Sequence, residues 1–424
     1  MEKKDHVLLG AALTVGAVEG WLDEHVDPET GYVVDDTLAI EGAAADSKAT
    51  GEAIAAVEAE IPAVDATLTT TGAAADAKKT GDEIADLKSA VQLLEDYISP
   101  TIISDPAELQ RVVSAGRIRD YLSIGDIVII PWTDNNPSTP VTYQYPFVVA
   151  HIGDVYDQND VKHENALWLM ARYATNIDMV FDAAEAIEAT EETFTEGWYY
   201  YTKNEDNSYT QATVTYGDAI PAGTTYYHHK LSGATGLLRY GYNRWRYSAY
   251  RQWLNSGAAK NANWWTAQHD CDVAPSSTYT NKAGWLNGFT ADWLSIIKPV
   301  KVQTACNTVT DGGVTDTTYD RFFLPSLEQA YGSPQASGVE GVYWEWWKEA
   351  TGLESPSNGS SSNTNDARKV PAVNAPAGNA VTCWLRSASR SGTGSAWYVH
   401  SAGFLGSSYG AGYNLRGLPA CVIY

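Results

Sequence analysis

A serine inside a GxSxG pattern is the most direct candidate in this sequence for covalent chemistry. The pattern occurs as GSSYG (406–410), with Ser408 at its centre. In hydrolases that use it, the serine lies between a strand and a helix, and a histidine later in the chain acts as the base. No strand–turn–helix frame surrounds Ser408, and the last histidine, His400, precedes it. The pattern therefore indicates a Gly/Ser-rich run, not a nucleophile.

Two short stretches contain residue types that bind metal ions. QHDCD (268–272) places a histidine, a cysteine and two aspartates together, and His228 and His229 end a tyrosine-rich stretch. No CxxC pair, HExxH sequence or other zinc-site spacing accompanies them. A turn and an exposed ribbon are the simpler interpretations, so we predict no metal ion and no cofactor.

Paired carboxylates are a further source of chemistry, because glycosidases use two of them. Asp182/Glu185 and Glu345/Glu349 have helical spacing, but so does an ordinary solvated helix face. A catalytic pair of carboxylates that come from distant segments remains an alternative. No enzyme signature stands out, and we predict a non-enzymatic protein.

Charge and aromatic content narrow the classes of partner. The 424 residues carry a formal net charge of −24, which argues against nucleic acid and anionic membranes. The 26 tyrosines and 15 tryptophans far outnumber the 7 phenylalanines. Such side chains suit surfaces that contact carbohydrate or protein, and also large β-rich cores. Four cysteines are too few for a disulfide scaffold, although Cys383 and Cys421 bracket one segment.

The N-terminal segment, 1–35, has only part of the pattern of a signal peptide. Two lysines precede the uncharged run Val7–Val18, but acidic residues interrupt the start and no clear cleavage site follows. No other run approaches the roughly 20 apolar residues that span a bilayer. We therefore expect synthesis in the cytoplasm without a signal peptide, and no membrane insertion.

A tandem repeat follows. DTLAIEGAAADSKATGEAI (36–54) recurs as ATLTTTGAAADAKKTGDEI (66–84). Small and apolar residues step by four and three, which is the pattern of a coiled-coil seam. The seam of the second copy is Ala73, Ala77, Thr80, Ile84, Leu87, Val91, Leu94 and Ile98. We predict a stalk at 36–100 that self-associates through 36–99 as a homotrimer; the alternative is two helices packed on the chain's own globular part.

The composition changes after Pro100. Asp105 and Pro106 predict the start of a short helix. Three β-like runs follow it, and a segment at about 187–239 alternates aromatic and polar residues like a β-ribbon insert. The runs are IGDIVIIPW (124–132), YQYPFVVAHIGDVY (143–156) and ALWLMARYA (166–174). NRWRYSAYRQWLNS (243–256) predicts one helix, and ESPSNGSSSNTND (354–366) predicts a polar loop.

The C-terminal stretch, 382–424, places a run of Ser, Gly, Ala and Tyr between two apolar segments, Cys383–Arg386 and Leu418–Ile423. This stretch contains WLRS, AWYV and PACVI in that order. Upstream of it, the chain contains SIGDIVIIPW, ALWLMARYA, RWRYSAYRQWLNS and DRFFLPSLEQAYG. Over roughly 119–186 and 240–424 the chain resembles the lectin-like domain of phage and bacterial surface proteins, including the variable proteins of diversity-generating retroelements such as phage tropism determinants. The early repeat and WLDEHVDPETGYVVDDTL resemble N-terminal regions of phage tail-fibre proteins.

The resemblance implies an α+β chain with a C-type-lectin-like domain at 101–424, a β-ribbon insert, and a preceding helical coiled-coil stalk. Trp384 and Leu385 would anchor one strand in the core. Trp397 would point inward on the next strand, leaving Tyr398 and His400 on the other face.

In the diversified relatives, adenine mutagenesis of Asn codons produces variable residues on the loops of a rigid sheet, where changes alter ligand choice without loss of folding. A nearby reverse transcriptase gene with a matching template repeat would decide whether this applies here. The corresponding positions are Arg390, Ser391, Thr393, Ser395, His400, Ala402, Phe404, Leu405, Ser407, Ser408, Tyr409, Ala411, Tyr413 and Asn414.

Two departures limit the resemblance. The Glu-Pro-Asn, Gln-Pro-Asp and Trp-Asn-Asp strings of calcium-dependent lectins are absent, which argues against a calcium-bridged sugar site. Cys421 lies in an apolar stretch where a thiol is usually inert, which argues against the related oxidase activity.

The predicted function is host-receptor binding at a phage tail. The ligand would be a protein or glycan on the host-cell surface, and segment 1–35 would attach the chain to other phage tail proteins in the virion. The alternatives are a polysaccharide-degrading tail enzyme and a bacterial surface adhesin with the same fold.

Overall fold

The computed structural model describes residues 104–186, 197–215, 226–332, 338–352 and 366–424. The predicted attachment segment 1–35, the stalk at 36–100 and nearly all of the polar loop at 354–366 lie outside these residues. The described residues form a mixed α+β fold that consists mostly of β-sheets with few helices, which confirms the predicted class. None of the described helices is long and apolar enough to cross a membrane.

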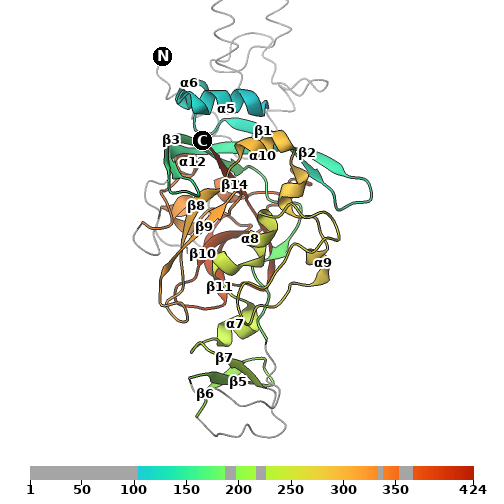
Figure 1. Ribbon diagram of the computed structural model, residues 1–424, viewed down its shortest axis with the longest axis vertical. Helices are drawn as coiled ribbons and strands as arrows, with labels where there is room; N and C mark the ends of the chain where they lie inside the picture. The colour runs from blue at the N-terminus through green and yellow to red at the C-terminus, as the bar shows by residue number, and fades with distance from the viewer. Residues whose placement is uncertain (1–103, 187–196, 216–225, 333–337, 353–365) are drawn as a thin grey trace, which may run out of the picture. The chain divides into compact units, whose positions relative to one another are not determined.

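Two larger sheets form the body of the described domain, and two smaller ones are attached to it (Figure 1). The first has the order β1-β2-β3-β14, and the second has the order β12-β11-β10-β13-β4. The strands of the first are β1 (Ile127–Asp134), β2 (Val141–Tyr156), β3 (Lys162–Ala171) and β14 (Ala420–Ile423). Those of the second are β4 (Met179–Val180), β10 (Cys383–Ala388), β11 (Ser395–Val399), β12 (Leu405–Gly410) and β13 (Asn414–Gly417). The three β-like runs predicted after Pro100 are thus confirmed as β1 to β3.

The smaller sheets have the orders β6-β5-β7 and β8-β9. Their strands are β5 (Tyr199–Lys203), β6 (Tyr209–Thr213), β7 (Tyr226–His229), β8 (Val300–Ala305) and β9 (Thr315–Asp320). The first of these sheets lies in the segment predicted as a β-ribbon, and a turn at Asn204–Asn207 joins β5 to β6. Tyr201 on β5 is fully buried in a small cluster of its own with Leu237 and Leu238.

The described helices are short and cover the sheets. They are α5 (Pro106–Ser114), α6 (Ile118–Tyr121), α7 (Thr235–Tyr240), η1 (Trp245–Tyr247), α8 (Ala249–Leu254), α9 (Ser277–Thr280), η2 (Trp285–Gly288), α10 (Ala291–Ile296), α11 (Leu327–Tyr331), α12 (Glu345–Thr351) and η3 (Asp366–Arg368). Asp105 caps α5, as predicted, because its carboxylate accepts a hydrogen bond of 2.9 Å from the Ala107 amide.

The single helix predicted at 243–256 is interrupted. Ser248 has extended backbone angles, and its hydroxyl accepts a hydrogen bond of 3.1 Å from the Arg251 amide, so α8 begins only at Ala249. The residues before it form the 3-10 turn η1. Trp245, Tyr250 and Trp253 of this segment are all buried.

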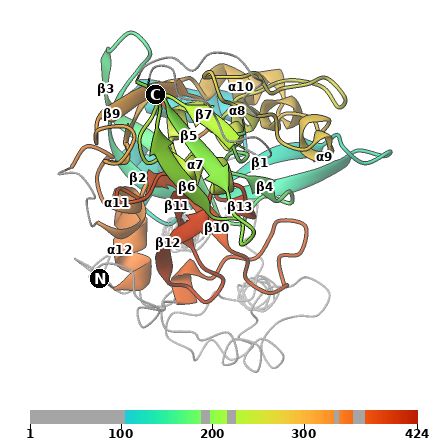
Figure 2. The same ribbon diagram turned by 90° about the horizontal axis from the view of Figure 1, so that it is seen from below.

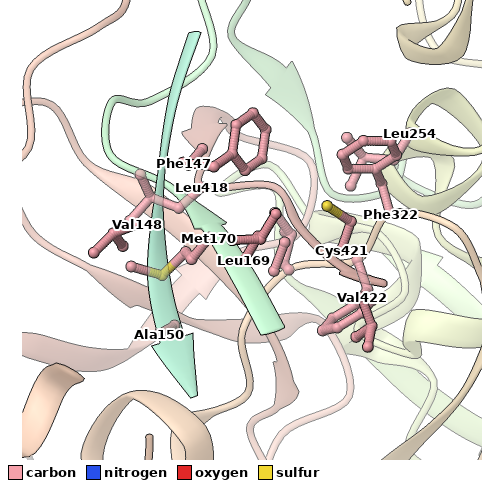
Figure 3. Packing of buried hydrophobic residues seen from close by; sticks show 14 of the residues in the cluster. Phe147, Val148, Ala150, Leu169, Met170, Leu254, Phe322, Leu418, Cys421 and Val422 are labelled. Atoms are coloured by element: carbon pink, nitrogen blue, oxygen red, sulfur yellow. The ribbon is translucent and has the colours of Figure 1, made fainter. Parts of the chain in front are cut away.

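The last strand closes the core. β14 pairs antiparallel with β3, so that Cys421 lies opposite Leu169, and every residue of β14 is buried. Figure 3 shows Cys421 and Val422 packed beside Leu169 and Phe322. Burial raises the pKa of the Cys421 thiol, as expected for an inert side chain. All four cysteines are free, so Cys383 and Cys421 do not form a disulfide.

Candidate binding surface

The C-terminal segment forms one edge of the second sheet (Figure 2). β10 pairs with β13 in parallel and with β11 in antiparallel, and β12 pairs with β11 and is the edge strand. Trp384 and Leu385 are buried on β10, in agreement with their predicted role as anchors. The outer strand and its turns are therefore supported by a neighbouring strand that is anchored in the core.

Aromatic rings line this edge in a continuous row. Tyr413 contacts Tyr409 with ring centroids 5.7 Å apart, and Tyr409 contacts Tyr398 at 4.5 Å. Phe404 contacts Tyr398 at 6.5 Å and stacks on His400 at 4.3 Å. We call the half-buried or exposed members of this row, together with Ser407 and Ser408 on β12, the aromatic edge. Its members are His400, Phe404, Ser407, Ser408, Tyr409 and Tyr413.

Tyr398 is the support of this row and not part of its exposed face. It is only 6% exposed, so on this strand both Trp397 and Tyr398 are buried. Its ring lies over Gly406, where an added Cβ would be 2.4 Å from the ring. A strand residue that has no side chain is required there, because any other would displace the ring that Tyr409 and Phe404 contact.

The turn between β11 and β12 is held by its own hydrogen bonds. The His400 amide donates to the Phe404 carbonyl at 2.8 Å, and the Gly403 amide donates to the His400 carbonyl at 2.7 Å. Gly403 has φ +83°, a conformation that favours glycine. His400 Nδ1 accepts from the Ala402 amide at 3.0 Å. The turn therefore presents His400 and Phe404 in one defined arrangement.

The structure divides the predicted variable positions into three groups. Four are exposed: Ser391, Ser408, Tyr413 and Asn414. Seven are half-buried: Arg390, Ser395, His400, Ala402, Phe404, Ser407 and Tyr409. Three are buried: Thr393, Leu405 and Ala411.

The three buried positions correct the prediction, because a buried side chain cannot contact a ligand. Leu405 lies opposite Val399 and faces the core. Thr393 packs on Gly236, where an added Cβ would be 2.1 Å from its hydroxyl. Ala411 is bonded through its backbone on both sides, to the Gly394 carbonyl at 2.8 Å and from the Asp182 amide at 3.0 Å.

The turn between β10 and β11 is separate from the aromatic edge. The Arg390 guanidinium donates to the carbonyls of Cys306 and Gly313 at 3.1 and 3.4 Å, so its donors are used within the fold. Its own carbonyl accepts from the Thr308 amide at 2.8 Å. The β11–β12 turn is at the other end of β11. Arg390 is therefore a positioning residue, not a ligand contact.

The aromatic edge has the chemistry of a binding surface. Ring faces stack on sugar rings or apolar side chains, and serine hydroxyls donate and accept hydrogen bonds. The edge contains no carboxylate, so it has no acid–base pair of the kind that glycosidases use. Ser408 is on a plain edge strand, so the GxSxG match is not a nucleophile elbow.

The different burial of Tyr413 and Leu405 predicts that substitutions at the two positions affect stability very differently. We expect Tyr413→Ala, at a side chain that is 55% exposed, to change the free energy of unfolding by less than about 0.5 kcal/mol. Leu405→Ala should cost about 2 kcal/mol, because it leaves a cavity at the edge of the core. Chemical denaturation of the two variants measures this, and equal losses would contradict the assigned burial.

Several polar residues to which the sequence analysis assigned no chemical role lie close together outside the aromatic edge. Asp182 and Glu185 are not on a helix; they follow β4, next to His229 at the end of β7 and to His269 and Asp272 in the loop before α9. Glu345, by contrast, pairs with His151 of β2 at 2.7 Å. No spacing pattern could have found the first group, because its members come from three distant segments.

Comparison with known proteins gives one result. The family model described as a domain of unknown function, DUF6273, matches residues 230–423, which include the aromatic edge and most of the second sheet. No curated protein matches the chain, and no solved structure does. Over this stretch the chain is therefore similar to a family that is defined by its sequence, without a described activity.

Proposed function

We propose that this protein is a non-enzymatic receptor-binding protein that contacts a host-cell ligand through the aromatic edge. The single observation that carries this proposal is the row from Tyr413 to His400, which leaves its ring edges and two serines accessible on the outermost strand of a buried sheet. Aromatic and small hydroxyl side chains on a rigid support make adaptable contacts at low entropic cost.

The finer fold assignment belongs to the same proposal. A C-type-lectin-like domain is supported by the low helix content, the long irregular connections and a final set of strands whose edge is accessible. The phage-tail setting is supported by the N-terminal sequence resemblance. A trimeric stalk at 36–100 would join three heads, and linked heads gain on the order of 10²–10⁴ in apparent affinity without any new contact.

The variability proposed for this segment is consistent with where its positions lie. Ser408, Tyr413 and Asn414 are exposed, and exchanges there leave the core of the sheet untouched. We restrict the proposed variable surface to the exposed and half-buried positions of the segment other than Arg390, whose guanidinium is bound within the fold.

The test measures binding of the full chain to a panel of bacterial cells and to an array of their surface glycans. The double variant Phe404→Ser/Tyr413→Ser should lose at least about tenfold in affinity, since interface aromatics commonly contribute more than 1 kcal/mol each. Tyr319→Ser is the matched control, because this tyrosine is 39% exposed on β9, outside the second sheet. Equal binding by both variants would refute the proposal, and release of oligosaccharides from the array would favour the degrading enzyme instead.

A further inference from the structure

Three segments meet behind the aromatic edge and bury an unusual set of polar side chains. Asp182 and Glu185, which follow β4, are fully buried, and His229 at the end of β7 is 5% exposed. The loop before α9 adds His269 and Asp272. The ligand atoms of Asp182, His269 and Asp272 all lie within 4.8 Å of one another.

Most of the atoms that converge there have no hydrogen-bond partner. They are both carboxylate oxygens of Asp182, Oε1 of Glu185, Nε2 of His269 and Oδ1 of Asp272, although the backbone amides of Tyr242 and Ala249 lie near enough to Asp182 to lower its pKa. His269 Nε2 is 3.2 Å from Glu185 Oε1, yet the two do not form a hydrogen bond. Within the described part of the chain, neither Lys nor Arg forms an ion pair with any of these residues. Buried polar atoms are almost always paired, so such a group needs an explanation.

Burial and the neighbouring charges shift the pKa values of the group. Burial raises the pKa of Asp182 well above its usual range, and the neighbouring carboxylates of Asp272 and Glu185 raise it further. Burial also raises the pKa of Asp272 to about 6. The pKa of His269 is lowered to about 4, first by burial and then by His229.

We propose that Asp182, Glu185, His269 and Asp272 bind one divalent first-row transition metal ion, Zn²⁺ or Mn²⁺. Bonds of about 2.0 Å to a tetrahedral ion place neighbouring ligand atoms about 3.3 Å apart. The separation of His269 Nε2 and Glu185 Oε1, 3.2 Å, agrees with this geometry. Carboxylates with one imidazole suit these ions better than Ca²⁺ or Mg²⁺, which take oxygen ligands alone.

His229 positions Glu185 and is not itself a ligand. The Leu231 amide donates to His229 Nδ1 at 3.1 Å, and an amide can only donate, so Nδ1 is the acceptor and the proton is on Nε2. That nitrogen donates to Glu185 Oε2 at 3.0 Å. This leaves Oε1 free to face the ion, which is the usual arrangement around a ligating carboxylate.

The neighbouring residues of the 268–272 stretch stay outside the set. The Cys271 sulfur lies within 4.8 Å of ligand atoms of Glu185 and His229, in a group separate from that of Asp182, His269 and Asp272. Asp270 pairs with Lys230 at 2.7 Å, and its side chain is 76% exposed. These two residues are therefore natural controls.

The ion would have a structural role. Its ligands come from the segment after β4 and from the loop before α9, and His229 adds the base of the β5–β7 sheet. The Asp182 amide also donates to the Ala411 carbonyl, directly after β12. A metal bound by these protein groups would therefore fix the insert and the end of the aromatic edge on one support.

The experiment uses the full-length chain. Metal content is measured by mass spectrometry after dialysis, and chelator-stripped protein is titrated with Zn²⁺, Mn²⁺ and Ca²⁺ by calorimetry and by thermal unfolding. We expect about one equivalent of Zn²⁺ or Mn²⁺, micromolar or tighter binding, and a Tm rise of about 5 °C at a hundredfold excess over the dissociation constant. Asp182→Asn and His269→Gln should abolish binding, His229→Gln should weaken it about 10–100-fold, and Asp270→Asn and Cys271→Ser should leave it unchanged.

A second readout separates a metal site from a metal-free polar network. In stripped protein, Asp182→Asn should raise Tm, because it removes one of three repelling carboxylates. A network that needs no ion would instead lose stability. Absence of Zn²⁺ and Mn²⁺ binding to the stripped wild-type chain, or equal binding by Asp182→Asn and Asp270→Asn, would overturn the proposal.

Discussion

Replacing Arg386 with methionine should cost about 3–5 kcal/mol of unfolding free energy, because several buried acceptors would lose their donor at about 1–3 kcal/mol each. The Arg386 side chain is buried on β10, and its Nη1 donates to the Leu324 carbonyl at 2.9 Å and to Gln329 Oε1 at 2.6 Å. Nη2 donates to the carbonyls of Glu340 and Gln303 at 2.5 and 3.3 Å. Methionine fills much of the volume but makes none of these bonds.

The loss extends to the carboxylate of Glu340, which is also buried. It accepts from the Ser387 hydroxyl at 2.6 Å and from the Ala305 amide at 3.1 Å. Burial raises its pKa, and the charge of Arg386 counteracts that rise. Without Arg386 the carboxylate would stay buried without its nearby positive charge.

Denaturation by urea measures this effect, with Arg117→Met as the matched control. Arg117 pairs with Asp120 at the surface, where its side chain is 59% exposed, so this change should cost at most about 1 kcal/mol. Adding Glu340→Gln to Arg386→Met should restore part of the stability. A loss near that of the control would show that the buried network is not what holds β10.

Asn243→Ala should cost about 3 kcal/mol, because several buried polar groups would lose their partners at about 1–3 kcal/mol each. Asn243 is fully buried, and its Nδ2 donates to the carbonyls of Gly392 and Ser395 at 2.6 and 2.8 Å. Its Oδ1 accepts from Asn307 Nδ2 at 3.1 Å. One side chain thus holds both ends of the turn between β10 and β11.

Hydrogen exchange of the 389–395 amides checks this prediction together with chemical denaturation. Asn243→Asp is the sharper variant, because it keeps the shape but points a carboxylate oxygen at carbonyls that need a donor. It should be at least as destabilising as alanine. Asn204→Ala, in the exposed turn of the β5–β6 hairpin, is the control and should stay within about 0.5 kcal/mol. Faster exchange in the control than in Asn243→Ala would contradict the assigned role.

Elements set by neighbouring residues were predictable. The start of α5 follows from Asp105 and Pro106 alone, because capping is a contact between residues two positions apart. The β-like runs at β1, β2 and β3 identified three strands of the first sheet. The inert character of Cys421 followed from its apolar stretch.

Features set by long-range packing were not predictable in detail. Leu405 and Thr393 belong to residue types that a variable loop tolerates, but strand register and the contact with Gly236 bury them. Tyr398 was placed on the face opposite Trp397, but its burial beside Gly406 depends on how β11 pairs with β12.

The sequence by itself, through its family resemblance, predicted the α+β class and the stretch that contains the aromatic edge. It also predicted the first strands and the start of α5, because these depend on residues close together in the chain. Only the tertiary structure decided which side chains of that edge are accessible. It alone also brought Asp182, His269 and Asp272 into one group. The physical reason is that local propensities act between neighbours, whereas burial and charge convergence arise only when distant segments pack.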